Sequence, residues 1–250
     1  MYNFNYVFIF FVQSFLRVCN FDKNLNMSNH FFTKSKYTII AMSVISISII
    51  IALYSLNIKS KSLPIYNPID VNPKLVDYSL LNISKNHTIG EFSLTDQNGK
   101  KITPLDFKDK IYVADFFFTR CGTICPIMTD HMYTLQQKFI NNSHIKFLSH
   151  SVTPVMDSVP VLNKYAKAHG AISNKWHITT GSKKMIYDLA RKSYFAVLDE
   201  GDGGVQDFIH TEQFILIDTK KRIRGFYDGT DQKEIEQLTR DIQLLQKEEY

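Results

Sequence analysis

The stretch Val113–Met128, VADFFFTRCGTICPIM, joins a strongly apolar segment to one that carries a proline near its start. The apolar segment, Lys110–Phe118, has the composition of a central strand buried on both faces. The segment Pro126–Ile140 is expected to be a helix, because proline is tolerated in a first turn, where its missing N–H is not needed. Cys121 and Cys125 fall at the junction, and α/β folds place their sites at this carboxyl edge of the sheet.

Outward from this stretch, segments with strand and helix patterns alternate along the chain. Residues 91–103 alternate around Asn98-Gly99, which predicts a hairpin. A second hairpin is expected at 214–218 and 222–227. Further strands are expected at 145–151 and 176–178, and further helices at 159–168, 182–191 and 232–247. This order predicts an α/β sheet with helices on both faces.

The N-terminal part is expected to lie outside the folded domain. Residues 37–56, YTIIAMSVISISIIIALYSL, are 20 residues without a charge, the length that spans the apolar core of a bilayer. A single transmembrane anchor is expected there. Residues 1–36 are expected to be a leader, and Met27 is an alternative start that opens a short basic stretch before the apolar run. The apolar stretch 2–18 has three interpretations: a second membrane span, a signal peptide, or a segment that does not belong to the protein because translation starts at Met27.

A linker and one folded domain are expected after the anchor. Residues 57–84 contain three prolines and little periodicity, which is typical of an extended tether. The folded domain is expected at 85–250. These boundaries predict a single-pass membrane protein.

The composition is that of an ordinary globular protein, with 44% hydrophobic and 21% charged residues. The net charge of +5 is mild and the lysines and arginines are scattered, which argues against nucleic-acid binding. Three cysteines are too few for a disulfide-stapled scaffold. Cys19 lies in the expected leader, so Cys121 and Cys125 form a local site that suits an oxidising compartment.

The position and spacing of the two body cysteines favour a thiol or soft-metal site. The start of a helix stabilises a thiolate over a thiol. A spacing of four residues along one helical turn brings both sulfurs to the same side, close enough to share a metal or form a disulfide. Dithiol oxidoreductases usually have C-x-x-C, whereas this chain has C-x-x-x-C. Two thiolates and one imidazole suit Cu(I), which accepts low coordination.

Five segments carry a resemblance to a known family. They are FFFTRCGTICPIMT at 116–129, SVTPVMDSVPVLNKYAKAHG at 151–170, HTEQFILID at 210–218 and IRGFYDGT at 223–230, with W-x-x-T-T-G from Trp176. Together they resemble the Sco/SenC family of copper-binding assembly factors for cytochrome c oxidase, over roughly residues 85–245.

The resemblance implies a thioredoxin-like fold, an N-terminal anchor and one copper ion held by Cys121, Cys125 and His210. It implies a location in the cell inner membrane, with the C-terminal domain on the periplasmic or extracytoplasmic side. It also implies that the chain delivers copper to the copper A centre, reduces that centre's cysteines, or does both. The partner would be the copper-bearing subunit of cytochrome c oxidase or its assembly factors. In this reading the protein is a metallochaperone rather than an enzyme, with possible thiol–disulfide reductase activity.

The residues alone leave the third ligand open among eight histidines. His144, His150, His169 and His177 fall at the ends of expected elements, where histidine usually meets solvent or a backbone carbonyl. His210 precedes the strand FILID, which is expected beside the cysteine-bearing strand. The preceding loop, LDEGDGGVQDF, has three glycines that would let the imidazole move on and off a metal.

A thiol–disulfide oxidoreductase acting on an extracytoplasmic client is the main alternative. Asp115 lies six residues before Cys121, the offset of the buried acid in thioredoxins, where it can act as a base. Such oxidoreductases also carry a cis-proline before the strand that faces the dithiol, but this chain has no proline after Pro160. His210-Thr211-Glu212 stands there instead, which favours the metal reading. The same thiolates can also do both.

Overall fold

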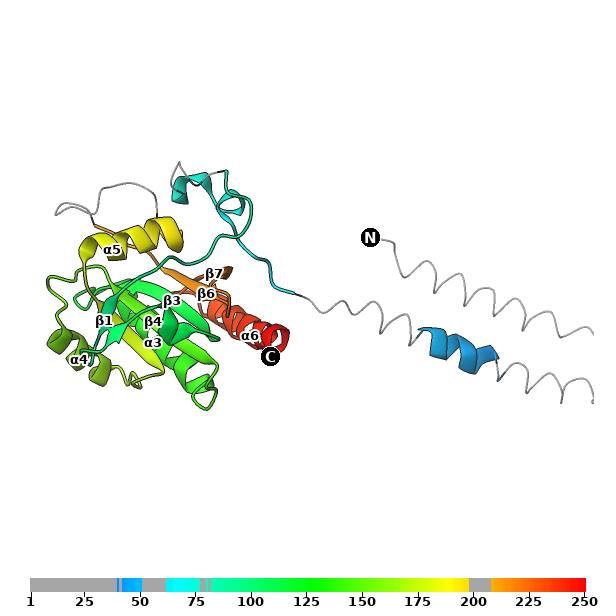
Figure 1. The fold of residues 1–250 in the computed structure, drawn as a ribbon. Coiled ribbons are helices and arrows are strands. Elements are labelled where there is room, and N and C mark those ends of the chain that lie inside the picture. The colour runs from blue at the N-terminus through cyan, green and yellow to red at the C-terminus, as the bar shows by residue number, and fades with distance from the viewer. Residues whose placement is uncertain (1–39, 41, 51–61, 77–79, 81, 198–207) are drawn as a thin grey trace, which may run out of the picture. The chain divides into compact units, whose positions relative to one another are not determined.

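The structure is a computed structural model that describes residues 40, 42–50, 62–76, 80, 82–197 and 208–250 (Figure 1). The chain divides into two compact units, Met1–Ser60 and Lys61–Tyr250. In the first unit the described residues, 40 and 42–50, are helical. Among the described residues, no helix combines the length and the apolar character needed to cross a membrane. The predicted leader and half of the predicted anchor lie outside the described residues.

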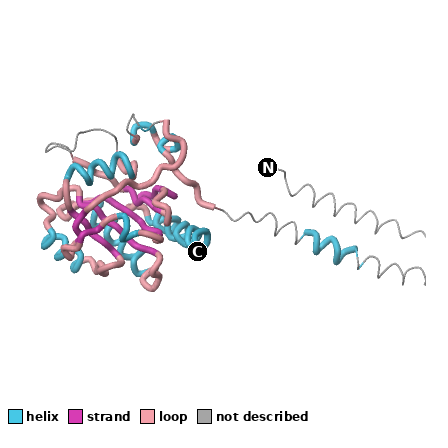
Figure 2. The backbone as a smooth tube through the Cα atoms, viewed as in Figure 1, coloured by secondary structure: helices cyan, strands magenta, loops and turns pink. Residues whose placement is uncertain are grey.

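The second unit is built on one seven-stranded sheet, whose strands lie together with helices around them in Figure 2. The strands are β1 (Leu94–Asp96), β2 (Lys101–Ile102), β3 (Ile111–Phe117), β4 (Ile145–Ser151), β5 (Trp176–Thr180), β6 (Gln213–Ile217) and β7 (Ile223–Asp228). The helices are α3 (Ile124–Lys138), α4 (Val159–Ala168), α5 (Lys183–Asp188) and α6 (Gln232–Glu249), and a π-helical turn, Leu189–Ser193, continues α5.

The strand order is β2-β1-β5-β4-β3-β6-β7. β3 pairs in parallel with β4, from Ile111 beside Ile145 to Phe117 beside Ser151. On its other side β3 pairs antiparallel with β6, so that Ala114 lies beside Ile215. The two predicted hairpins are confirmed as the antiparallel pairs β1–β2 and β6–β7. The cysteine-bearing loop therefore leaves a central strand between one parallel and one antiparallel neighbour.

Helices cover both faces of the sheet, as the sequence predicts. Side chains alternate along a strand, so β3 sends Val113 and Phe117 to one face and Ala114 and Phe116 to the other. The first face packs against α3, α4 and α6. The second face packs against α5, the π-helical turn and Val76. In Figure 1, α5 accordingly lies on the opposite side of the sheet from α3 and α6.

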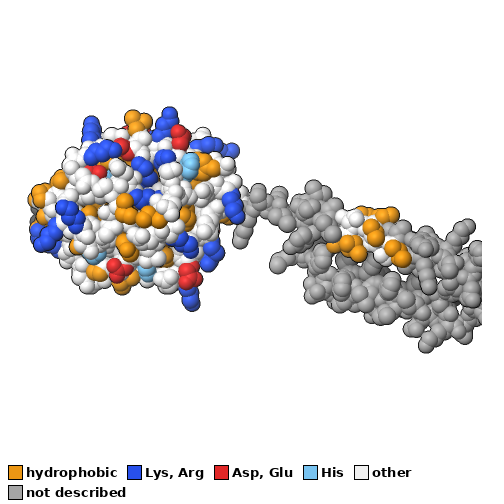
Figure 3. Space-filling view, turned by 90° about the horizontal axis from the view of Figure 1, so that it is seen from below, with side chains coloured by type: hydrophobic (Ala, Val, Ile, Leu, Met, Phe, Trp, Pro, Cys, Tyr) orange, Lys and Arg blue, Asp and Glu red, His pale blue; other side chains and the backbone are white. Residues whose placement is uncertain are grey.

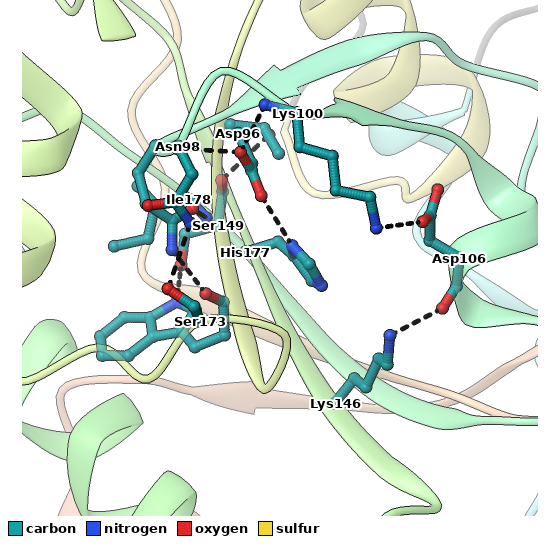
Figure 4. A network of polar contacts seen from close by, with 12 residues as sticks. Asp96, Asn98, Lys100, Asp106, Lys146, Ser149, Ser173, His177 and Ile178 are labelled. Carbon is teal, nitrogen blue, oxygen red and sulfur yellow. Dashed lines mark hydrogen bonds and ion pairs between the residues drawn. The ribbon is translucent and has the colours of Figure 1, made fainter. Parts of the chain in front are cut away.

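A buried polar network fastens the β1–β2 hairpin to β5 (Figure 4). Asp96 accepts hydrogen bonds from the N–H groups of Asn98 and Lys100, which fixes the turn. Its second oxygen lies 3.2 Å from Nδ1 of His177 in β5. Gln97 bridges to the same strand, donating to the carbonyl of Trp176 and accepting from the N–H of Ile178. These bonds compensate for the shortness of the hairpin strands.

Part of the segment predicted as an extended linker packs against the domain, and we call residues 62–76 the strap. Tyr66 forms an antiparallel bridge with Ile223 of β7. Arg224, which is 4% exposed, donates to the carbonyls of Leu63 and Pro64. Two 3₁₀ turns, Pro68–Asp70 and Pro73–Leu75, complete the strap. Pro68 and Pro73, two of the three prolines that suggested a tether, thus start tight turns.

Candidate functional site

The two body cysteines meet at the junction of β3 and α3. Cys121 follows the strand, and its N–H donates to the carbonyl of Phe118 at 3.2 Å. Cys125 lies in the first turn of α3, and its N–H donates to Sγ of Cys121 at 3.4 Å. Both are free thiols, with Cys121 partly exposed and Cys125 buried. The predicted proximity of the two sulfurs is therefore observed in the folded chain.

The two thiols differ in acidity although they share one helical turn. Burial alone would raise the pKa of Cys121, but hydrogen bonds from Thr123, from the Cys125 thiol and from backbone N–H groups lower it to about 6. Burial raises the pKa of Cys125 to about 12, and the charge of Cys121 adds to that effect. At neutral pH the pair is therefore one exposed thiolate beside one buried thiol.

Asp115 lies in β3 on the face that α3 covers. Its side chain accepts a 2.5 Å hydrogen bond from Oγ of Ser149, which in turn accepts from Nε1 of Trp176. Burial raises the pKa of Asp115 to about 7. Its charge also contributes to the raised pKa of Cys125. The acid that the sequence singled out is therefore buried and electrostatically coupled to the inner thiol.

His210 lies at the same edge of the sheet, just before β6. It is exposed, and its ring centroid is 6.5 Å from that of Phe118, the residue whose carbonyl accepts the N–H of Cys121. Phe208 contacts the same Phe118 ring edge-on at 5.4 Å. Among the described residues, no three His, Cys, Asp or Glu side chains converge closely enough to hold a metal ion. The fold brings the two cysteines together and leaves His210 beside their loop.

Several other candidate ligands have structural roles. His131 is held by a 2.7 Å bond from its Nδ1 to the carbonyl of Gly229. His150 and His177 are completely buried within β4 and β5, so the expectation that they meet solvent or a backbone carbonyl at element ends is wrong. β4 ends at Ser151 as predicted, and β5 continues two residues beyond the predicted 176–178, to Thr180. Met128 and Met132 are also fully buried in the core under α3.

The surface carries no indication of a phosphate-binding face in the view of Figure 3. Lysine and arginine side chains are spread over the rounded domain there, with hydrophobic and acidic side chains between them. A basic groove that follows a nucleic-acid backbone would gather these charges on one face. The face seen in Figure 3 therefore gives no support to nucleic-acid binding.

Comparison with known proteins gives consistent matches. The SCO1/SenC family model matches residues 82–246. The SCO1 protein homolog of Bacillus subtilis is 31% identical over 159 residues, which are 63% of this chain and 82% of that protein. Protein SCO2, mitochondrial, of Saccharomyces cerevisiae is 32% identical over 136 residues, but these are only 44% of that protein.

Three solved structures show the same fold. A SCO1/SenC family lipoprotein from Bacillus anthracis is 31% identical with a TM-score of 0.57, covering 64% of this chain and 96% of that one. BsSco, a Sco family cytochrome c oxidase assembly protein with a disulfide switch, is 31% identical with a TM-score of 0.54, covering 63% and 92%. Arabidopsis thaliana ScoI with copper bound is 25% identical with a TM-score of 0.50, covering 62% and 97%.

The matched residues include the two cysteines at the strand-to-helix junction, Asp115 beneath α3 and His210 before β6. They extend through the whole sheet that positions these residues. On this match, which covers well over half of its length, the chain belongs to the SCO1/SenC family.

Proposed function

We propose that the chain is a membrane-anchored copper chaperone that assists assembly of the copper A centre of cytochrome c oxidase. It binds one copper ion through Cys121, Cys125 and His210. The observation that carries the proposal is the pair of adjacent sulfurs at the β3–α3 junction, one of them a thiolate at neutral pH. Copper is bound in ScoI of Arabidopsis thaliana, and BsSco belongs to a family of oxidase assembly proteins.

The two thiols suit Cu(I), since soft thiolate ligands favour that ion. Cys125 must lose its proton on binding, because its pKa of about 12 keeps it protonated at neutral pH. His210 completes the ligand set by turning toward the sulfurs from its place beside Phe118. Loading and release of the cargo then depend on the exposed segment before β6.

The anchor belongs to this proposal. Residues 37–56 supply an uncharged segment of bilayer length, and the folded unit begins at Lys61. The domain is then held at the periplasmic or extracytoplasmic side of the inner membrane. If the full chain and residues 61–250 partition equally into the soluble fraction of expressing cells, the anchor is excluded.

A thiol–disulfide oxidoreductase is the second candidate, and the split in pKa favours it. Cys121 is suited to attack a client disulfide, because it is exposed and ionised at neutral pH. Cys125 is suited to resolve the mixed disulfide after transferring its proton to Asp115, whose pKa of about 7 makes it a usable base. The client gains two thiols and the chain gains one Cys121–Cys125 disulfide.

Copper titration of residues 61–250 distinguishes the two candidates. We expect His210→Ala to weaken binding of both Cu(I) and Cu(II) by at least about tenfold, since losing even an outer-shell partner of a metal ligand costs about 10–100-fold in affinity. His131→Ala is the matched control, because that ring is bonded to Gly229. If His210→Ala binds both ions as tightly as the wild type while disulfide exchange persists, the carrier function fails and the oxidoreductase function is favoured.

A further inference from the structure

A buried carboxylate lies directly behind the loop that carries Cys121. Asp157, in the turn between β4 and α4, is 0% exposed and accepts four hydrogen bonds. Two come from Thr119, from its N–H at 3.2 Å and its hydroxyl at 2.6 Å. The others come from the hydroxyls of Ser151 at 2.6 Å and Thr153 at 2.9 Å.

Three of these donors converge on Oδ2, namely the Thr119 N–H and the hydroxyls of Ser151 and Thr153, while Oδ1 accepts the Thr119 hydroxyl. The donors come from three segments: the β3–α3 loop, the end of β4 and the β4–α4 turn. All four donors are neutral, so the carboxylate is held by geometry rather than by a counter-charge. Asp157 thereby ties the carboxyl ends of two adjacent parallel strands together.

The Thr119 contacts fix the position of Cys121. Thr119 precedes Cys121 by two residues, and the Phe118 carbonyl to Cys121 N–H bond closes a tight turn across them. Thr119 donates two hydrogen bonds to the Asp157 carboxylate, one from its backbone N–H and one from its hydroxyl, so both its backbone and its side chain are held. A second link between the same two loops runs from Nη1 of Arg120 to Sδ of Met156 at 3.1 Å.

We propose that Asp157 is a positioning residue that holds the Cys121 loop so that its sulfur stays within reach of Cys125. The proposal rests on the proposed function and adds to it a residue outside the expected ligand set. Loosening this loop lowers the effective concentration of one thiol toward the other. The dithiol–disulfide equilibrium then moves toward the dithiol, and copper held by the same two sulfurs dissociates faster.

Two isosteric variants test the proposal, because each removes one hydroxyl donor from the same carboxylate. Thr119→Val alters the bond on the cysteine loop, and Thr153→Val alters the bond on the far turn. Each folded variant of residues 61–250 is equilibrated with a mixture of reduced and oxidised glutathione. In this exchange the Cys121–Cys125 dithiol and one glutathione disulfide give the Cys121–Cys125 disulfide and two glutathione thiols. This measurement needs no copper. The Cu(I) dissociation rate is measured separately with a competing chelator.

We expect Thr119→Val to shift the glutathione equilibrium toward the dithiol by about tenfold, which is about 30 mV for a two-electron couple. Cu(I) should leave it faster, while Thr153→Val stays within about twofold of the wild type at a similar loss of Tm. Equal shifts in both variants, or no shift in Thr119→Val, overturn the proposal. If the wild type binds no copper, the chaperone function fails while the glutathione result still decides the role of Asp157.

Asp157→Asn provides a second, larger perturbation. An amide keeps only one of the two acceptor oxygens, so the four donors can no longer all be satisfied, and we expect a shift toward the dithiol at least as large as that of Thr119→Val. Adding Thr119→Val to Asp157→Asn should then change the equilibrium little, because both variants loosen the same link between Thr119 and residue 157. Full additivity of the two shifts contradicts the proposal. The threonine pair decides the question whether or not Asp157→Asn folds.

Discussion

At the scale of single residues, the thiols of Cys121 and Cys125 differ in pKa although the two residues are only four positions apart. Cys121 lies at the open end of α3, where N–H groups and hydroxyls face its sulfur, and Cys125 lies one turn further into the core. The sequence predicts the stabilised thiolate from the helix start. It does not predict which thiol is acidic, because that depends on burial of Cys125 in a core completed by residues distant in sequence, such as Leu162.

Alkylation rates test this assignment. At pH 7 iodoacetamide should modify Cys121 far faster than Cys125, because only the thiolate is nucleophilic. The Cys121 rate should rise with pH through about 6 and then level off, whereas an ordinary thiol has an inflection near 9. Peptide mass spectrometry of residues 61–250 over pH 5–9 measures both rates. Faster modification of Cys125 would reverse the roles given to the two sulfurs.

At the scale of elements, local patterns predict most strands and helices of the domain. The hairpins, α3 and α6 follow from turn residues and periodicity. The strap does not, because its stability comes from Arg224 and α6, more than 150 residues away in sequence. For the same reason, His150 and His177 could not be recognised as core residues. Only neighbouring strands show that these positions lie inside the sheet.

The strap depends on one buried cation. Arg224 pairs with Asp218 and with Glu248 of α6, and Glu248 also accepts the N–H of Leu63. Arg224→Ala should lower the free energy of unfolding by about 3 kcal/mol, because it leaves buried charges and strap carbonyls without their partner. Urea denaturation of residues 61–250 measures the loss. Arg240→Ala, an exposed arginine on α6 bonded to Gln237, is the control.

An equal, small effect of the two arginine variants would show that the strap does not depend on this ion-pair cluster. Limited trypsin digestion adds a local measurement, since Lys74 is exposed but a docked strap holds its backbone in a turn, whereas a released strap can enter the protease as an extended chain. We expect faster cleavage at Lys74 in Arg224→Ala than in Arg240→Ala. Identical cleavage rates would mean that the strap stays docked through Tyr66 and Val76 alone.

At the scale of the whole molecule, strand order assembles the site from distant segments. β4 brings Asp157 and β6 brings His210 to the carboxyl end of β3. The sequence predicts that β3 and β6 are neighbours, and the structure confirms it. It cannot predict where the His210 ring points, because that depends on contacts such as the one with Phe118. The metal-ligand set therefore stays a prediction, although the fold that positions it is established.

The stability of the domain should fall in acid because of His150. Burial among aromatic rings lowers its pKa from 6.5 to about 3, so the folded state keeps it neutral while the unfolded chain takes up a proton. Its contribution to stability is complete above pH 6.5 and declines toward pH 3. Between pH 7 and pH 4.5 this amounts to about 2–3 kcal/mol, at about 1.4 kcal/mol per pKa unit.

His150→Leu removes this titration and provides the comparison. Urea denaturation at pH 7 and pH 4.5 should show the variant losing about 2–3 kcal/mol less than the wild type over that interval. The carboxylates titrate in both proteins, so their contribution to the loss of stability cancels in the difference between the variant and the wild type. Parallel losses in the two proteins would mean that His150 becomes protonated in the folded state without cost.

The Tyr66–Ile223 bridge also has a consequence for how this domain meets other chains. β7 is an outer strand of the sheet, and an unpaired outer strand offers a row of N–H and C=O groups on which a foreign strand can assemble. The strap covers part of that row, and the opposite margin ends in β2, which has only two residues. Neither edge of the sheet therefore offers a long row of unpaired backbone groups, and this disfavours fibre-like association through added strands.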